Sequence, residues 1–208
     1  MVRVMGQPVA GIDPRIGFVF QHDAVFPWRS VVYNVAAGPL FRGTARPAAF
    51  AKAKEWVARV GLAGFENHYP HQLSGGMRKR VALAQTFING PEILLMDEPF
   101  SALDVQTRIL MQDELLKLWS SLKASVVFVT HDLEEAIALA DRVYVLTSGP
   151  GTVKSVYKVD LPRPRVISEA RFQPEFVELS KRIWGDLRQE VEAGFNRAAE
   201  PSTVGGGQ

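Results

Sequence analysis

The chain has 208 residues, of which 47% are hydrophobic and 22% charged, and it contains no cysteine. This composition is globular, and a chain of this length buries about 70% of its unfolded surface. The net charge is only +2 and Arg78, Lys79 and Arg80 form the only tight basic cluster, so charge does not favour a nucleic-acid partner. No disulfide framework, secretory signal or bilayer-length apolar run is present, and we expect a soluble protein without its own anchor.

The first part of the chain is predicted to form one buried strand followed by helices. Residues 16–20 are an apolar run typical of a buried strand, and the polar Gln21 follows it. A short helix is expected over 31–37, where a Gly-Pro pair interrupts it. Apolar residues at helical spacing then predict a second helix over 46–60.

Ser74, Gly75 and Gly76 precede a helical pattern over 77–87. Ser74 suits the N-cap, and two glycines let backbone amides at the helix N-terminus approach an anion such as a phosphate. A capped helix with a flexible entry explains the same three residues without any ligand. These residues alone leave both interpretations open.

The stretch over 93–104, ILLMDEPFSALD, joins an apolar run to two adjacent acids. Four large apolar residues indicate a strand buried on both faces, and Asp97 and Glu98 stand at its carboxyl end. Ligands of open parallel sheets bind at that edge, so the acids suggest a cation or an attacking water. A pair of solvated loop acids is the alternative.

The rest of the sequence predicts helices over 104–122, 133–140 and 174–193. It predicts strands over 126–130, 143–147 and 153–159. Alternation of strands and helices predicts a parallel sheet with right-handed crossovers. Three strand ends then bring Gln21, the acids Asp97 and Glu98, and His131 to one edge of this sheet. An amide, two carboxylates and an imidazole suit a metal, a water and a phosphate. Alone, His131 would be interpreted as a structural histidine.

One combination of motifs is highly specific, and it consists of Gln21 at a strand end, LSGGM at 73–77, ILLMDEP at 93–99, SALD at 101–104 and His131. In this order and spacing the motifs resemble the ATP-binding subunit of ABC transporters over nearly the whole chain. Residues 18–43 and the ending RFQPEFVELSKRIW are similar to the nitrate, sulfonate and taurine importer subgroup.

The resemblance implies an α/β fold like that of P-loop NTPases, with a parallel sheet, helices on both faces and an inserted helical subdomain. It divides the chain into five segments. Residues 1–23 would be a partial ATPase core with the Q-loop, and residues 24–88 a helical subdomain with the signature motif. Residues 89–168 would be an ATPase core with Walker B, D-loop and switch histidine, followed by a C-terminal helix over 169–195 and a disordered tail over 196–208.

The resemblance also assigns roles at the sheet edge. Gln21 would be the Q-loop glutamine that touches Mg²⁺ and the attacking water and senses the membrane partner. Asp97 would be the Walker B acid that holds Mg²⁺ through water, and Glu98 would be the general base. His131 would be the switch histidine that contacts the γ-phosphate of ATP.

A second set of roles belongs to the dimer that the resemblance implies. Ser74, Gly75 and Gly76 would be the signature motif, which caps the γ-phosphate of ATP held by the opposite subunit. Asp104 and its loop would communicate across the dimer. Met77 stands where the family usually has glutamine, and this change leaves the backbone donors intact.

One departure from the family is serious, because no G-x-x-x-x-G-K-[ST] motif occurs in the 208 residues. The P-loop with its flanking strand and helix is therefore missing, either through a misplaced start or because the chain is a fragment. By family analogy the missing strand lies between the strands over 126–130 and 143–147. We expect a gap there, low stability and no ATPase activity of the isolated chain.

The implied function is the ATPase of an importer for a small anionic solute, at the cytoplasmic face of the plasma (inner) membrane. Implied cofactors are ATP and Mg²⁺, and implied partners are a second, identical ATPase subunit, membrane permease subunits and, indirectly, a solute-binding protein, with no nucleic acid. The alternative is a non-catalytic module that supplies Ser74 to Gly76 in trans to a complete partner. An ATPase of chromosome maintenance or DNA repair is disfavoured, because no long coiled-coil heptads separate Gln21 from Leu73.

Overall fold

The computed structural model describes residues 2–122 and 124–199. The chain forms two compact units, Met1–His131 and Asp132–Gln208. The predicted core segment over 89–168 thus contributes to both of them.

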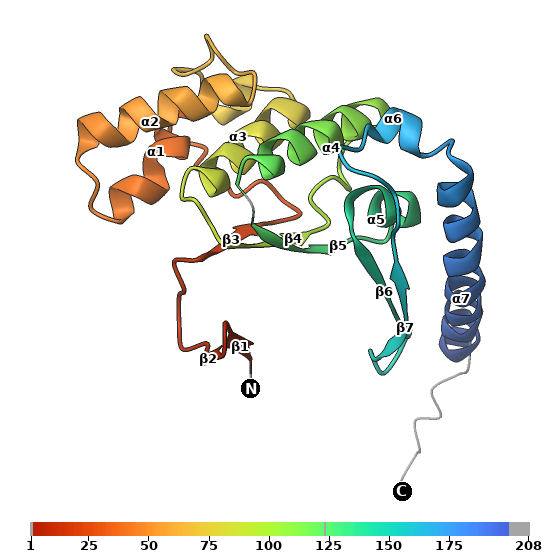
Figure 1. Ribbon diagram of the computed structural model, residues 1–208. Helices are drawn as coiled ribbons and strands as arrows, with labels where there is room; N and C mark the ends of the chain where they lie inside the picture. Colours follow the sequence, from red (N-terminus) through yellow and green to blue (C-terminus); the bar gives the residue numbers. More distant parts are fainter. Residues whose placement is uncertain (1, 123, 200–208) are drawn as a thin grey trace, which may run out of the picture. The chain divides into compact units, whose positions relative to one another are not determined.

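A three-stranded parallel sheet forms the base of the first unit (Figure 1). Its strands are β3 (Ile16–Val19), β4 (Ile93–Asp97) and β5 (Ser125–Val129), in that order across the sheet. Phe18 lies opposite Leu95, which lies opposite Val127, so these three side chains share one face of the sheet. The three strands and their parallel pairing are as the sequence predicted, but the expected burial of β5 is wrong, because Val126, Val127 and Val129 are exposed.

Two helices lie along one face of this sheet (Figure 1), α3 (Gly75–Phe87) and α4 (Val105–Ser120). Leu94 and Met96 are buried, whereas Phe18 and Val127 on the opposite face are 40% and 57% exposed. Alternation along each strand explains this difference, since successive side chains point to opposite faces.

Two further helices, α1 (Val31–Phe41) and α2 (Arg46–Arg59), pack with α3, and a 3₁₀ turn over Pro70–Gln72 leads into α3. The predicted end of α1 at Ala37 is wrong, because the helix continues through the buried Pro39. Proline removes one helix hydrogen bond, but the tight packing of α1 retains the turn, and the Arg42 amide still donates to the Gly38 carbonyl.

A small hairpin near the N-terminus was not predicted from the sequence. It consists of β1 (Arg3–Val4) and β2 (Gln7–Pro8), which pair antiparallel. Met5 and Gly6 between them both have positive φ, of 48° and 79°, as a two-residue hairpin turn requires.

The second unit contains α5 (Leu133–Leu139), β6 (Arg142–Leu146), β7 (Val153–Lys158), α6 (Ile167–Ala170) and α7 (Pro174–Ala199). β6 and β7 form an antiparallel pair, and α5 packs against α7. The short α6 was not predicted. α7 runs beyond its predicted end at about 193, and the rest of the expected tail, 200–208, lies outside the described residues.

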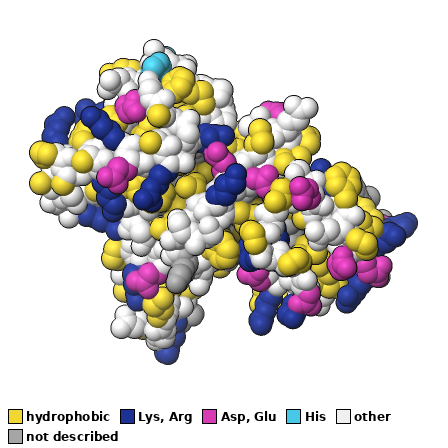
Figure 2. Space-filling model, turned by 45° about the horizontal axis from the view of Figure 1, so that its top comes forward, with side chains coloured by type: hydrophobic (Ala, Val, Ile, Leu, Met, Phe, Trp, Pro, Cys, Tyr) yellow, Lys and Arg dark blue, Asp and Glu magenta, His cyan; other side chains and the backbone are white. Residues whose placement is uncertain are grey.

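In the described part of the chain β5 pairs only with β4, and β6 pairs only with β7. The α/β class with a parallel sheet is confirmed. None of the described helices is long and apolar enough to cross a membrane. On the face shown in Figure 2, Lys and Arg side chains are mixed with Asp and Glu.

Candidate functional site

The carboxyl ends of the three parallel strands meet around the carboxylate of Glu98. Its Oε1 lies 3.1 Å from Nδ1 of His131, and its Oε2 accepts a hydrogen bond of 3.4 Å from Nε2 of Gln21. The same Nε2 lies 3.4 Å from Oγ of Ser101, whose hydroxyl donates to the Glu98 carbonyl over 3.0 Å. The structure therefore brings together residues that are 77 and 33 positions apart in the sequence, as the parallel sheet predicts.

The backbone of Glu98 has an uncommon conformation. Its φ is +40°, a value that costs a non-glycine residue about 1–2 kcal/mol. The Glu98 amide donates to the Val129 carbonyl over 2.9 Å, which extends the pairing of β4 and β5 by one residue. The strained conformation turns the chain immediately after the strand and fixes the carboxylate at the sheet edge.

Asp97 is the last residue of β4, and its side chain is exposed. Its carboxylate and the amide oxygen of Gln21 are oxygen ligands of the kind that Mg²⁺ prefers. Among the described residues no group of three or more His, Asp or Glu side chains is arranged to hold a metal ion. This donor set fits an ion that keeps several waters and is shared with substrate phosphates, which is how proteins usually bind Mg²⁺.

The N-termini of α3 and α4 lie beside each other. Ser74 caps α3, because its Oγ accepts from the Met77 amide over 3.2 Å. A Cβ added to Gly76 would lie 3.0 Å from Cγ2 of Thr107 in the first turn of α4. The predicted N-cap of α3 is confirmed, and contact of this helix end with a phosphate stays a prediction.

Asp104 caps α4 in the same way, with Oδ1 accepting from the Thr107 amide over 3.0 Å. This hydrogen bond from the Thr107 backbone holds the pKa of Asp104 below its ordinary value. Asp104 therefore carries its negative charge at the positive end of α4.

Lys79 is a neighbour of the site that sequence reasoning did not single out. The side chain is 3% exposed, and its Nζ lies 2.9 Å from Oδ1 of Asp23 and 3.2 Å from the Gln21 carbonyl oxygen. The sequence showed only a cluster of three basic residues, which is usually a solvated surface. A helical wheel marks position 79 as neighbouring the buried face, but only the fold shows its acceptors.

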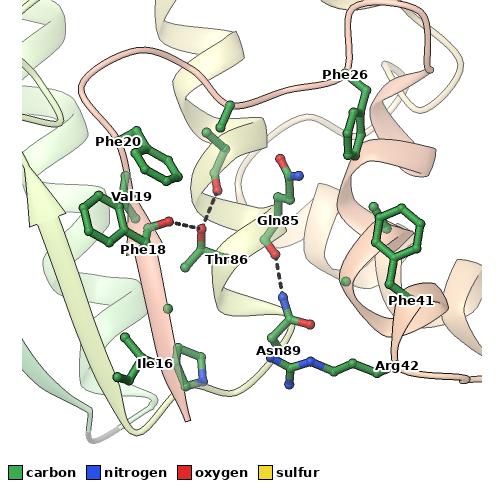
Figure 3. Close-up of a pocket in the computed structure, with 16 residues that line it drawn as sticks. Ile16, Phe18, Val19, Phe20, Phe26, Phe41, Arg42, Gln85, Thr86 and Asn89 are labelled. Atoms are coloured by element: carbon green, nitrogen blue, oxygen red, sulfur yellow. Dashed lines mark hydrogen bonds between the residues drawn. The ribbon is translucent and has the colours of Figure 1, made fainter. Parts of the chain in front are cut away.

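A cavity of about 320 Å³ opens beside β3, on the side of α1 and α3 (Figure 3). Four phenylalanines contribute to its lining, Phe18, Phe20, Phe26 and Phe41. Its polar residues are partly engaged with the backbone: the Thr86 hydroxyl lies 3.2 Å from the Phe18 carbonyl oxygen, and the Asn89 amide donates to the Gln85 carbonyl over 2.9 Å. The cavity is therefore largely apolar. Phe20 in its lining is the sequence neighbour of Gln21.

Comparison with known proteins gives a consistent family. Residues 3–101 match the family model described as ABC transporter. An uncharacterised ABC transporter ATP-binding protein of Methanocaldococcus jannaschii is 49% identical over 186 residues, which are 89% of this chain and 68% of that protein.

Two further relatives carry the names of importers. The nitrate import ATP-binding protein of Synechocystis sp. is 41% identical over 92% of this chain and 76% of its own length. The aliphatic sulfonates import ATP-binding protein of Bacillus licheniformis is 40% identical over 88% of this chain and 69% of its own.

A solved structure is also similar, that of a dimeric ATP-binding cassette in a post-hydrolysis state bound to ADP and Pi. It is 34% identical with a TM-score of 0.60, and the match covers 71% of this chain and 64% of the other. The chain thus spans less than two thirds of the length of that cassette.

Proposed function

This chain belongs to the ATP-binding proteins of ABC transporters, and we propose that it energises the import of a small anionic solute of the nitrate, sulfonate or taurine type. The names of the nitrate and sulfonate import relatives support this solute class. The observation that supports ATP hydrolysis as the energy source is the cluster of Gln21, Glu98 and His131 at the sheet edge.

In the proposed reaction, water attacks the γ-phosphate of ATP and Glu98 accepts a proton from it. A general base must lie within hydrogen-bond reach of its water in a fixed orientation. The carboxylate of Glu98 is held from two sides, by the Gln21 amide and the His131 imidazole, so it is oriented before substrate arrives. His131 is 70% exposed in its side chain, which leaves it accessible to a phosphate oxygen.

Mg²⁺ would neutralise charge on the phosphates in this reaction. We assign its protein ligands to Asp97, acting through water, and to the amide oxygen of Gln21. Asp97 suits this role because it is exposed beside Glu98 without sharing the same hydrogen bonds.

We propose that the partner for hydrolysis is a second, identical subunit, in line with the dimeric cassette that this chain resembles. Ser74, Gly75 and Gly76 would then face the ATP of that subunit from the N-terminus of α3, where backbone amides and the helix dipole favour an anion. Asp104 at the adjacent N-terminus of α4 would lie at the same dimer contact.

The second partner is a membrane permease, and we assign its docking site to the cavity beside β3. Its phenylalanine lining suits an apolar helix segment, and Arg42 in its wall suits an acidic side chain on that segment. Because Phe20 lines the cavity and directly precedes Gln21, binding of the permease would change the position of Gln21 at the catalytic edge of the sheet. The protein would act at the cytoplasmic face of the membrane, with a solute-binding protein as an indirect partner.

Reconstitution tests the proposed function. A full-length version of the chain that carries a P-loop would be assembled with the permease in proteoliposomes, and hydrolysis would be measured with nitrate, an alkyl sulfonate or taurine added with the solute-binding protein. We expect one of these anions to stimulate hydrolysis. No stimulation by any of them, with an intact complex, would contradict the solute class.

A second experiment separates catalysis from the trans-acting alternative. The 208-residue chain alone should not hydrolyse ATP, since no P-loop motif occurs in it. Mixed with a complete relative whose own signature serine is mutated, it should restore hydrolysis only if Ser74 to Gly76 act in trans. Rescue by the wild-type chain and by its Glu98→Gln variant alike would favour the non-catalytic alternative.

A further inference from the structure

Lys79 occupies a buried position between the signature helix α3 and the loop that follows β3. Its side chain is 3% exposed, and a lysine this deeply buried needs partners for its charge. Nζ lies 3.3 Å from the Phe20 carbonyl oxygen, 3.2 Å from that of Gln21 and 2.9 Å from Oδ1 of Asp23. The ammonium group donates hydrogen bonds to the two carbonyl oxygens, and it forms an ion pair with the Asp23 carboxylate.

The three partners of the Lys79 ammonium group all belong to the segment that carries Gln21. Two of them are the backbone carbonyls on either side of the Gln21 Cα, and the third is the carboxylate two residues further on. The Gln21 side chain leaves this same backbone to reach Glu98. A shift of the loop would therefore move the Gln21 amide away from the Glu98 carboxylate, because weak bonds of 3.4 Å tolerate little displacement.

We propose that Lys79 is a positioning residue that fixes Gln21 relative to the signature helix, so that Ser74 and Gln21 move as one body. The effect of this role on hydrolysis rests on the proposed function, whereas the anchoring of the Gln21 loop by Lys79 is independent of that function. The signature end of α3 is five residues from Lys79 on a continuous helix. Motion at Ser74 would then be transmitted to the Gln21 loop chiefly through the Lys79 ammonium group, beside which Arg78 Nε forms a longer ion pair of 3.7 Å with Oδ2 of Asp23.

Arg80 provides a matched control on the same helix. Its Nη1 donates to the Val60 carbonyl over 3.0 Å and to Glu114 over 2.8 Å, so it ties α3 to the end of α2 and to α4 instead. Replacing Arg80 by methionine removes a partly buried cation of similar size without touching the Gln21 loop.

The anchoring is tested on the 208-residue chain by hydrogen exchange of the backbone amides over 20–25. Lys79→Met should speed exchange of this segment about tenfold, since its opening no longer breaks the ammonium contacts, whereas Arg80→Met should leave it unchanged. Equal exchange in wild type and Lys79→Met, or equal acceleration in both variants, would overturn the proposal. Asp23→Asn gives the same test from the loop side if Lys79→Met fails to fold.

The effect on catalysis is tested in the transporter assembled from a full-length version of the chain that carries a P-loop. Lys79→Met should lower kcat about tenfold while KM for ATP stays within about twofold, because Gln21 positioning affects the transition state more than binding. Lys79→Arg, which keeps the donors, should recover part of this loss, and Arg80→Met should retain kcat. If kcat falls equally in Lys79→Met and Arg80→Met, the role is structural and the proposal is wrong. Hydrogen exchange is measured without nucleotide, so the two tests are independent. Faster exchange over 20–25 in Lys79→Met without a loss of kcat would refute the effect on catalysis but would support the anchoring of the loop.

Discussion

Gly76 of α3 and Thr107 of α4 lie in close contact, because a Cβ added to Gly76 would lie 3.0 Å from Cγ2 of Thr107. Any side chain at position 76 would require the Thr107 methyl group to move by a few tenths of an ångström. The N-termini of α3 and α4 are thereby held at one distance from each other, although 30 residues separate their starts.

Gly76→Val should therefore destabilise the protein by about 1–3 kcal/mol, since the added Cβ and its two methyl groups crowd Thr107 in the first turn of α4. Gly75→Ala is the matched control, because the nearest atoms to its Cβ are 3.9 Å away. Urea unfolding followed by circular dichroism measures both. A neutral Gly76→Val variant would show that the two helix ends are not closely packed.

Glu98→Gln in a full-length version of the chain that carries a P-loop should lower ATP turnover about 10²- to 10⁴-fold, because the amide cannot accept the proton of the attacking water. ATP binding should persist, since Asp97 and Ser74 are unchanged. Turnover and equilibrium nucleotide binding are the two measurements. Glu92→Gln, an exposed position just before the same strand, should retain wild-type turnover, and unchanged turnover in Glu98→Gln would exclude Glu98 as the base.

The cap at Asp104 predicts a pH dependence of stability. Its pKa is lowered in the folded protein by the hydrogen bond from the Thr107 backbone, so the charged form stabilises the fold above the ordinary pKa of an aspartate. This contribution should be lost as the pH falls through the lowered pKa. Asp104→Asn keeps the acceptor and does not titrate. Between pH 7 and pH 3 the wild type should therefore lose more stability in urea unfolding than Asp104→Asn, and equal losses would show that the cap does not depend on charge.

Phe41 tests the proposed permease site, because it lines the cavity yet is 75% exposed. Phe41→Ser should leave folding intact and weaken binding to the permease about tenfold, the effect of losing one aromatic contact at an interface. Phe172, which is 79% exposed in the second unit, provides the control variant Phe172→Ser. Affinity for the permease in detergent measures both, and equal weakening would place the interface elsewhere.

Strands and helices with a strong hydrophobic period were predictable from the sequence, and so was the meeting of Gln21, Glu98 and His131. Both follow from local pattern and from the geometry of parallel sheets. The path of α1 through Pro39 was not predictable, because packing against neighbouring helices outweighs the local preference of proline. Burial of Lys79 was hidden for a similar reason, since its acceptors lie about 58 residues away in the chain.

The positive φ of Glu98 has an evolutionary consequence. Glycine adopts this conformation without steric cost, so Glu98→Gly should relieve about 1 kcal/mol of backbone strain and partly offset its lost side-chain contacts. Selection for folding alone would thus favour a smaller residue at this position. The carboxylate that Gln21 and His131 contact is therefore present at this position at a cost in backbone strain.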